Sequence, residues 1–132
     1  LEFTEHFKYL HLAFLGRGRV EIQESSFGSI TVGGRRYNHD VWIMVDGSVE
    51  ERRGGYHTFL EAEVQTLIKK GTEVIVVGTG TSGCVEIDPS AEQLAKDKET
   101  EIVCDITPRA VEEYSRLTSK GKKVTAAFHV TC

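Results

Sequence analysis

The residues best suited to hold a ligand lie in a glycine-rich loop with the spacing Gly-x-Gly-x-x-Gly. Gly78, Gly80 and Gly83 set this spacing, and Thr79 and Ser82 supply hydroxyl groups between them. Because glycine tolerates positive φ and has no Cβ, such a loop can turn tightly or bring its backbone amides close to an anion. The same spacing is found in dinucleotide-binding loops. The loop is therefore the first candidate for an anion or nucleotide site.

The residues after this loop argue against a dinucleotide. In a dinucleotide site, a helix begins within the motif and directs its N-terminal amides at the pyrophosphate, and an acidic residue follows about 20 positions later. Asp105 lies near that position, but residues 84–88 alternate between apolar and polar types, and Pro89 delays any helix. We therefore expect a structural turn or a small-ligand site here, and no bound cofactor.

His129 and Cys132 form the second candidate, because an imidazole and a thiol can act as metal ligands or as a base and a nucleophile. A zinc site would require Cys84 or Cys104 to converge on them. A cysteine nucleophile would require a further residue to orient His129, and the sequence does not identify one. We therefore expect no metal and no complete catalytic set, and we assign His129 as a polar contact near the glycine loop.

The third candidate is a pocket or surface site containing His39, Trp42, Arg52 and Arg53. His39 and Asp40 are neighbours on a predicted strand, so their side chains point to opposite faces and do not form a proton relay by themselves. Tryptophan is more often a core residue than a ligand platform. The arginine pair lies beside two glycines and could form an anion-binding loop, although a solvated loop is the more common role.

The pattern of apolar residues predicts the elements that must position these candidates. Residues 20–52 alternate and turn like an antiparallel meander, with a two-residue hairpin signal at Gly33 and Gly34. Strands are predicted over residues 73–77, 101–104 and 123–130, and the last is small and β-branched enough to be central. An uninterrupted run of valine and isoleucine, as in residues 74–77, is typical of a strand buried on both faces.

Helices are predicted between these strands. The first covers residues 59–70, with Glu63 on its polar side and Gly71 at its end. The second covers residues 89–96. The third begins with Thr107 as its cap and Pro108 in its first turn, and ends before a glycine. Alternating strands and helices imply a largely parallel sheet, so we predict one α/β domain with an added antiparallel layer.

Composition narrows the class of protein. The chain has 132 residues, of which 39% are hydrophobic and 27% charged, and a net charge of −4. These values fit one globular domain and disfavour nucleic acid as a partner. No apolar run approaches the roughly 20 residues that span a bilayer, so we expect no membrane association. Three widely spaced cysteines without a Cys-x-x-Cys motif favour a reducing compartment over a disulfide framework, and we expect a cytoplasmic protein.

Several of these segments together resemble a known family. They are residues 27–30, 37–43, 76–83, 107–114 and the closing Phe128, His129, Thr131 and Cys132. They are similar to a small domain family that includes the adipogenesis-associated domain protein of animals, mitochondrial complex I assembly factor 3 and many short archaeal and bacterial proteins. Residues 1–23 lie outside the resemblance as a lead-in, and residues 24–132 form the single domain. The resemblance implies a three-layer β/β/α fold with a mixed, partly parallel sheet and an N-terminal antiparallel meander.

Two hypotheses about function follow. The resemblance implies no established reaction and no dinucleotide cofactor, and its best-placed members are assembly or regulatory proteins. We therefore favour a non-enzymatic binding, assembly or regulatory module that engages a protein partner or a second copy of itself. The alternative is a small-anion or nucleotide-binding enzyme that uses the loop of residues 78–83 with polar contacts from Thr79, Ser82 or His129.

Overall fold

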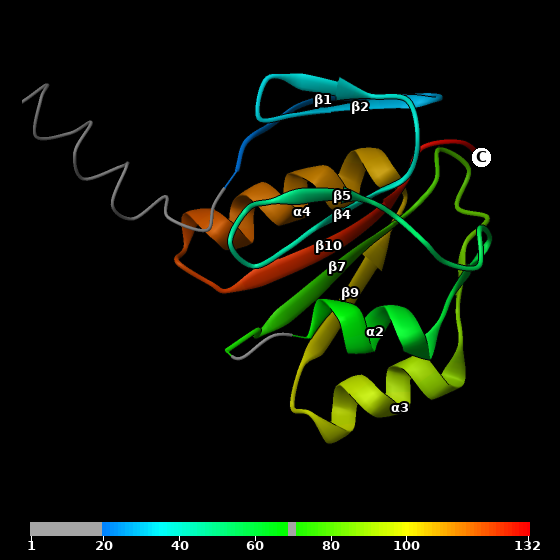
Figure 1. The fold of residues 1–132 in the computed structure, drawn as a ribbon, viewed down its shortest axis with the longest axis vertical. Helices are drawn as coiled ribbons and strands as arrows, with labels where there is room; N and C mark the ends of the chain where they lie inside the picture. The colour runs from blue at the N-terminus through cyan, green and yellow to red at the C-terminus, as the bar shows by residue number, and fades with distance from the viewer. Residues whose placement is uncertain (1–19, 69–70) are drawn as a thin grey trace, which may run out of the picture.

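A five-stranded mixed sheet forms the centre of the computed structural model, which describes residues 20–68 and 71–132 (Figure 1). The strand order is β5-β4-β10-β7-β9. β10 is parallel to β7 and antiparallel to β4, and β7 is also parallel to β9. The strands are β4 (Val41–Ile43), β5 (Val49–Glu51), β7 (Val74–Thr79), β9 (Glu101–Asp105) and β10 (Val124–His129). The order confirms that the closing strand is central.

Every residue of β7 and β10 is buried. Side chains alternate along β7, so that Val74 and Val76 enter one core while Ile75 and Val77 enter the other. This explains why the valine–isoleucine run shows no polar alternation. The sheet separates two hydrophobic cores, and its central strands contribute to both.

One face of the sheet is covered by α4 (Thr107–Ser119) and by a three-stranded antiparallel sheet (Figure 1). The small sheet contains β1 (Ile22–Ser26), β2 (Ser29–Val32) and β3 (Arg35–Tyr37). The glycines at its hairpin, Gly33 and Gly34, have φ values of 60° and 82°, which suits the predicted two-residue turn. The predicted antiparallel layer is therefore present, and the β4–β5 hairpin extends the main sheet.

The opposite face is covered by α2 (Glu61–Leu67) and α3 (Pro89–Asp97) (Figure 1). Asp88 caps α3 by accepting the Ser90 N–H at 3.0 Å, and Pro89 occupies the first turn as predicted. A short parallel pair, β6 (Thr58–Phe59) and β8 (Glu86–Ile87), lies beside these helices. The three layers confirm the mixed α/β single-domain fold.

Two helix starts differ from the prediction. α2 begins at Glu61 rather than at residue 59, because Phe59 pairs with Ile87 in the short parallel ladder. Thr107 does not cap α4: Ile106 occupies that position, and the Thr107 hydroxyl accepts from the Gly80 amide in the glycine loop and donates to the His129 carbonyl in β10. The end of the predicted first helix at residues 69–70 lies outside the described residues.

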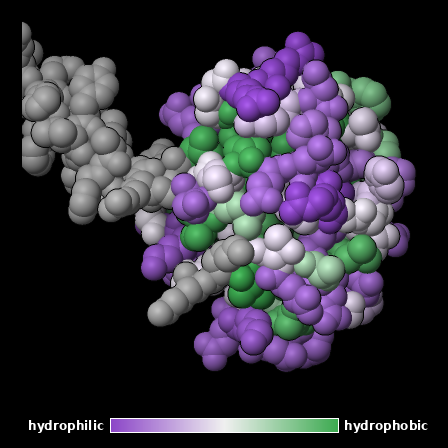
Figure 2. All heavy atoms as spheres, in the orientation of Figure 1, coloured by the Kyte–Doolittle hydropathy of each residue, from purple (hydrophilic) through white to green (hydrophobic). Residues whose placement is uncertain are grey.

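The N-terminal boundary of the domain stays a prediction. β1 begins at Ile22, while most of the expected lead-in, residues 1–19, lies outside the described residues. Figure 2 shows that hydrophilic side chains cover most of the face in view, with small hydrophobic groups between them. Among the described helices, none has the length and apolar character needed to cross a membrane.

Candidate functional site

The glycine loop at the end of β7 is occupied by the protein's own C-terminal segment. The Gly80 amide donates to the Thr107 hydroxyl at 2.9 Å, and the Thr81 amide donates to the Thr131 carbonyl at 2.9 Å. The Ser82 amide donates to the main-chain oxygen of Cys132, and the Gly83 amide donates back to the carbonyl of residue 80. These four amides are engaged by protein oxygens, so in this conformation they are not free to bind an anion.

The glycines of this loop are needed for close packing. Gly80 has φ +101°, and a Cβ at this position would lie 2.3 Å from the carbonyl carbon of Cys132. A Cβ on Gly78 would lie 2.6 Å from the ring of Phe128. The Thr79 hydroxyl donates to the Asp105 carbonyl at 3.0 Å. The loop therefore joins β7 to the C-terminal segment and to the end of β9.

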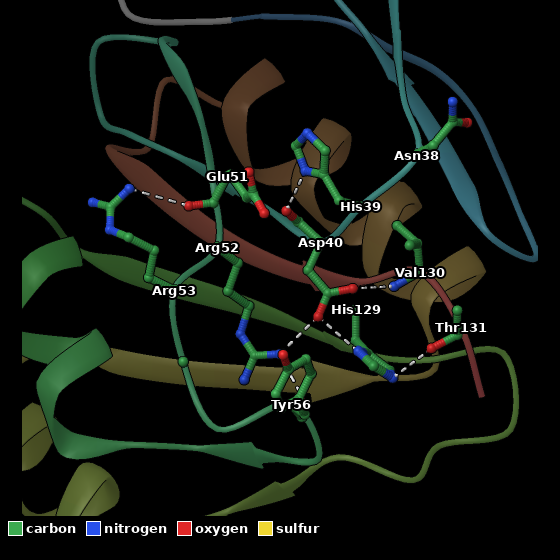
Figure 3. Close-up of a pocket in the computed structure, with 11 residues that line it drawn as sticks. Asn38, His39, Asp40, Glu51, Arg52, Arg53, Tyr56, His129, Val130 and Thr131 are labelled. Atoms are coloured by element: carbon green, nitrogen blue, oxygen red, sulfur yellow. Dashed lines mark hydrogen bonds and ion pairs between the residues drawn. The ribbon is translucent and has the colours of Figure 1, made fainter.

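A cavity of about 540 Å³ lies next to this segment and brings together residues that the sequence placed in two separate candidate sites (Figure 3). His39, Arg52 and Arg53 line it together with His129, whereas the predicted loop residues 78–83 do not. The complete lining consists of Asn38, His39, Asp40, Glu51, Arg52, Arg53, Gly54, Tyr56, His129, Val130 and Thr131. Trp42 does not line the cavity: it is buried, and Arg53 lies over its ring at 4.8 Å from the centroid.

Asp40 connects the side of the pocket that carries Arg52 to the side that carries His129 (Figure 3). One carboxylate oxygen accepts from Arg52 at 2.9 Å and from His129 Nδ1 at 2.7 Å, and the other accepts from the Val130 amide at 3.0 Å. Because a carboxylate can only accept, His129 carries a proton on Nδ1 and directs Nε2 toward the Thr131 hydroxyl at 3.1 Å. Asp40 is thus the residue that orients His129.

Sequence reasoning missed this pairing because it compared Asp40 only with its neighbour His39. The two strands provide the signal that was lacking. In the antiparallel ladder of β4 and β10, Phe128 lies opposite Val41. One more step in the same register places Asp40 opposite His129. His39 instead places its Nδ1 2.9 Å from the carbonyl of Asp40.

Arg52 is a buried cation whose hydrogen bonds are all used within the protein. Its five N–H groups donate to the carboxylates of Asp40 and Glu63 and to the carbonyls of Tyr56 and Thr58. Burial alone would lower the pKa of this guanidinium, but the hydrogen bonds and negative charges of Glu63 and Asp40 outweigh burial and raise its pKa. Arg52 therefore stays charged and stabilises the pocket wall, with no N–H left for an anion.

Glu63 is buried, which corrects its predicted place on the polar side of the first helix. Its side chain is 1% exposed and accepts hydrogen bonds from Trp42 Nε1 at 3.0 Å, from Arg52 and from the Leu60 amide. A Cβ on Gly54 would lie 2.5 Å from the Glu63 carboxylate, which explains the glycine there. The helical pattern gave no sign of this burial, because the partner that neutralises Glu63 lies in a different segment.

Tyr56 lies at the rim of the pocket in an unusual conformation. Its φ is 53°, in the left-handed region that residues other than glycine rarely adopt, and the residue is 78% exposed. Its carbonyl accepts a hydrogen bond from the buried Arg52 at 2.9 Å. The buried ion-pair network thus supports a strained turn that presents an aromatic side chain to solvent.

Cys84 and Cys132 form a disulfide, so the prediction against disulfide pairing is wrong at this position. Cys104 is free and exposed. His57 Nε2 lies 3.2 Å from the Cys132 sulfur, and His129 Nε2 lies 3.8 Å from it. The fold thus brings Cys84 next to His129 and Cys132, which is the convergence that the sequence could not establish.

Comparisons with known proteins agree on the fold and describe no activity. A family model described as "Protein of unknown function (DUF498/DUF598)" matches residues 22–129. A conserved hypothetical protein, PH1505 from Pyrococcus horikoshii OT3, is 28% identical with a TM-score of 0.76, and the match covers 85% of this chain and 99% of that one. A structure titled MT938 is 30% identical with a TM-score of 0.71, and the match covers 86% and 99% of the two chains.

A more distant structure shows the same fold. A Mth938-like domain from Bordetella pertussis is 16% identical with a TM-score of 0.67, and the match covers 84% of this chain and 85% of that one. At this identity the likeness concerns the fold alone. The fold is therefore shared across proteins whose descriptions assign no reaction.

Proposed function

The chain belongs to the DUF498/DUF598 family of proteins of unknown function, and from this premise we propose that it is a non-enzymatic binding module with regulatory or assembly roles. Its binding surface is the rim of the pocket beside Asp40, and its partner is another protein. The resemblance to assembly factors noted in the sequence supports this class of function. The strained and exposed Tyr56 is the observation that carries the proposal.

The polar groups of the inner wall support binding rather than turnover. Arg52 uses all of its donors within the protein, and Asp40 accepts three hydrogen bonds from the protein. A pocket wall whose polar groups all have hydrogen-bond partners in the protein is rigid, and it leaves few groups to transfer protons to or from a substrate. It suits the support of a rim whose shape stays constant when a partner docks.

The rim carries the residue types that dominate protein interfaces. Tyr56 is exposed, and Arg53 is exposed and lies over the Trp42 ring. Tyrosine and arginine are enriched among the residues that contribute most binding energy. Because Arg52 fixes the backbone carbonyl of residue 56, little backbone entropy would be lost when its side chain meets a partner.

A photo-crosslinking amino acid at position 56 tests the proposal in the native host. The matched control places the same group at Lys98, which is exposed at the end of α3. We expect one discrete protein adduct from position 56, weakened at least about 10-fold by Arg53→Glu, and none from position 98. An adduct with the mass of two chains would identify self-association. Identical adduct patterns from the two positions would contradict the proposal.

One observation favours an enzyme as the second candidate. His129 is oriented by Asp40 and presents an acceptor nitrogen at the edge of the cavity, which is the arrangement of a general base. A thermal-shift screen of nucleotides and small phosphates tests this candidate. If the protein is an enzyme of this class, a nucleotide or phosphate should raise its Tm, and the His129→Gln variant should not show this rise. A Tm that no compound raises would count against it.

A further inference from the structure

We propose that His57, Cys84, His129 and Cys132 form a metal site for a zinc-type cation when the disulfide is reduced. The ligand atoms of these four residues lie within 4.8 Å of one another. Two thiolates and two imidazoles make up a donor set that zinc binds tetrahedrally in structural sites. The site shares His129 with the pocket wall but does not use the rim side chains of Tyr56 and Arg53, so it does not depend on the proposed partner binding.

Two of the distances between donor atoms are already close to those of a zinc site. Tetrahedral ligands at about 2.0–2.3 Å from zinc lie about 3.3–3.8 Å from each other. The Cys132 sulfur is 3.2 Å from His57 Nε2 and 3.8 Å from His129 Nε2. The two imidazole rings meet edge to face, with their centroids 5.3 Å apart. Reduction frees the sulfurs to separate to a ligand–ligand distance while both nitrogens stay near their present positions.

The buried histidine is prepared for a metal by its outer hydrogen bond. Asp40 accepts from His129 Nδ1 at 2.7 Å and is itself held by Arg52 and by the Val130 amide. In metal-binding histidines, the N–H of the second ring nitrogen commonly donates a hydrogen bond to a carboxylate in this way. This bond fixes the tautomer and directs the lone pair of the other nitrogen at the metal. His129 Nε2 lies 3.1 Å from the Thr131 hydroxyl and 3.8 Å from the Cys132 sulfur. Its lone pair can therefore bind a metal beside Cys132 once the hydroxyl turns to another partner.

The four donors come from segments that are already held in place. His129 ends β10, and Cys132 is held by the hydrogen bonds that the Thr81 and Ser82 amides donate to the main-chain oxygens of Thr131 and Cys132. His57 and Cys84 precede the paired strands β6 and β8, and the Glu86 amide donates to the His57 carbonyl at 2.9 Å. Little reorganisation of the backbone is needed before a metal binds, which favours affinity.

Metal binding and the disulfide exclude each other, because both use the same two sulfur atoms. A small-molecule disulfide can convert one state into the other by thiol–disulfide exchange. The two protein thiolates lose one electron each and form the Cys84–Cys132 bond, and the small disulfide accepts both electrons and becomes two thiolates. The metal ion loses two ligands and is released. The centre is then a redox-controlled metal site.

Cobalt(II) is the probe for this site, because it replaces zinc and reports its ligands by absorption. The full chain without an affinity tag is reduced by a phosphine reductant under anaerobic conditions and titrated with cobalt. We expect one cobalt per chain, a thiolate-to-cobalt charge-transfer band and the d–d bands of tetrahedral geometry, all removed by added zinc. Oxidised protein should show none of these bands.

Matched variants separate this site from other thiols and imidazoles. Cys132→Ser and His57→Ala should each lose the tetrahedral spectrum, whereas Cys104→Ser and His39→Ala should keep it. His57 is exposed, so its variant reports on the site even if Cys132→Ser fails to fold. Asp40→Asn should weaken cobalt binding by about 10–100-fold. A reduced wild-type protein without a charge-transfer band, or a Cys104→Ser variant that loses it, would overturn the proposal.

Discussion

The glycine loop and the pocket beside Asp40 differ in how they are built. The loop is contiguous in sequence and resembles a ligand-binding motif, yet two of its amides bind the C-terminal segment of the same chain and a third binds Thr107. The pocket has no contiguous motif, yet it joins Asp40, Arg52, Glu63 and His129 in one hydrogen-bonded network. The comparison shows that spacing of residues identifies a backbone shape, whereas chemical function depends on which segments the sheet brings together.

The two regions also depend on each other. Thr107 donates its hydroxyl to the His129 carbonyl at 2.6 Å and accepts the Gly80 amide at 2.9 Å. The loop therefore fixes the end of β10, and the end of β10 carries the histidine that faces the pocket. The following changes separate the contribution of each region.

Removing the buried cation should cause the largest loss of stability. Arg52→Met leaves the buried Glu63 carboxylate without its cation and removes one partner of the partly exposed Asp40, and we expect the free energy of unfolding to fall by about 3–5 kcal/mol. Urea denaturation followed by circular dichroism measures the change. Arg53→Met is the matched control on an exposed neighbour and should cost less than about 1 kcal/mol.

A double variant shows whether the loss comes from the unpaired charge. Arg52→Met combined with Glu63→Gln removes the cation and one of its buried partners, so the two changes should not be additive. We expect the double variant to lose less than the sum of the single variants. Additive losses would contradict a coupled network.

A side chain at Gly80 should disturb the loop and the C-terminal segment together. The Cβ of Gly80→Ala meets the main chain of Cys132, and φ +101° is unfavourable for alanine. Gly121→Ala is the control, because its φ of +81° carries a similar backbone cost but nothing lies within 4 Å of its Cβ. We expect Gly80→Ala to destabilise the fold by about 1–3 kcal/mol more than the control. Equal losses of stability in the two variants would show that the main chain of Cys132 does not restrict a side chain at position 80.

Replacing Thr107 should have the smallest of these effects. Thr107→Val keeps the shape but leaves the Gly80 amide and the His129 carbonyl without this partner, and we expect a loss of about 1–3 kcal/mol in thermal or urea unfolding. Thr107→Ser keeps the hydroxyl and should retain most of the stability. If the serine variant were as unstable as the valine variant, the methyl packing and not the hydrogen bonds would explain the loss.

The sequence predicts the elements better than it predicts the site. The apolar run of β7, the proline at the start of α3 and the small residues of β10 each act locally, so their roles follow from neighbouring residues. Asp40 and His129 are separated by 89 positions and meet only through strand pairing. Glu63 was placed on the polar side because glutamate usually faces solvent, and only the buried Arg52 makes the opposite arrangement favourable.

The central claim is that the glycine loop holds the protein's own C-terminal segment and leaves external anions unbound. Backbone amide resonances of ¹⁵N-labelled protein, recorded while inorganic phosphate and a mononucleotide are added, test it most directly. The account predicts that the amides of Gly80, Thr81 and Ser82 keep their chemical shifts. Saturable shifts centred on these three amides would contradict it and would return the loop to the role that its spacing first indicated.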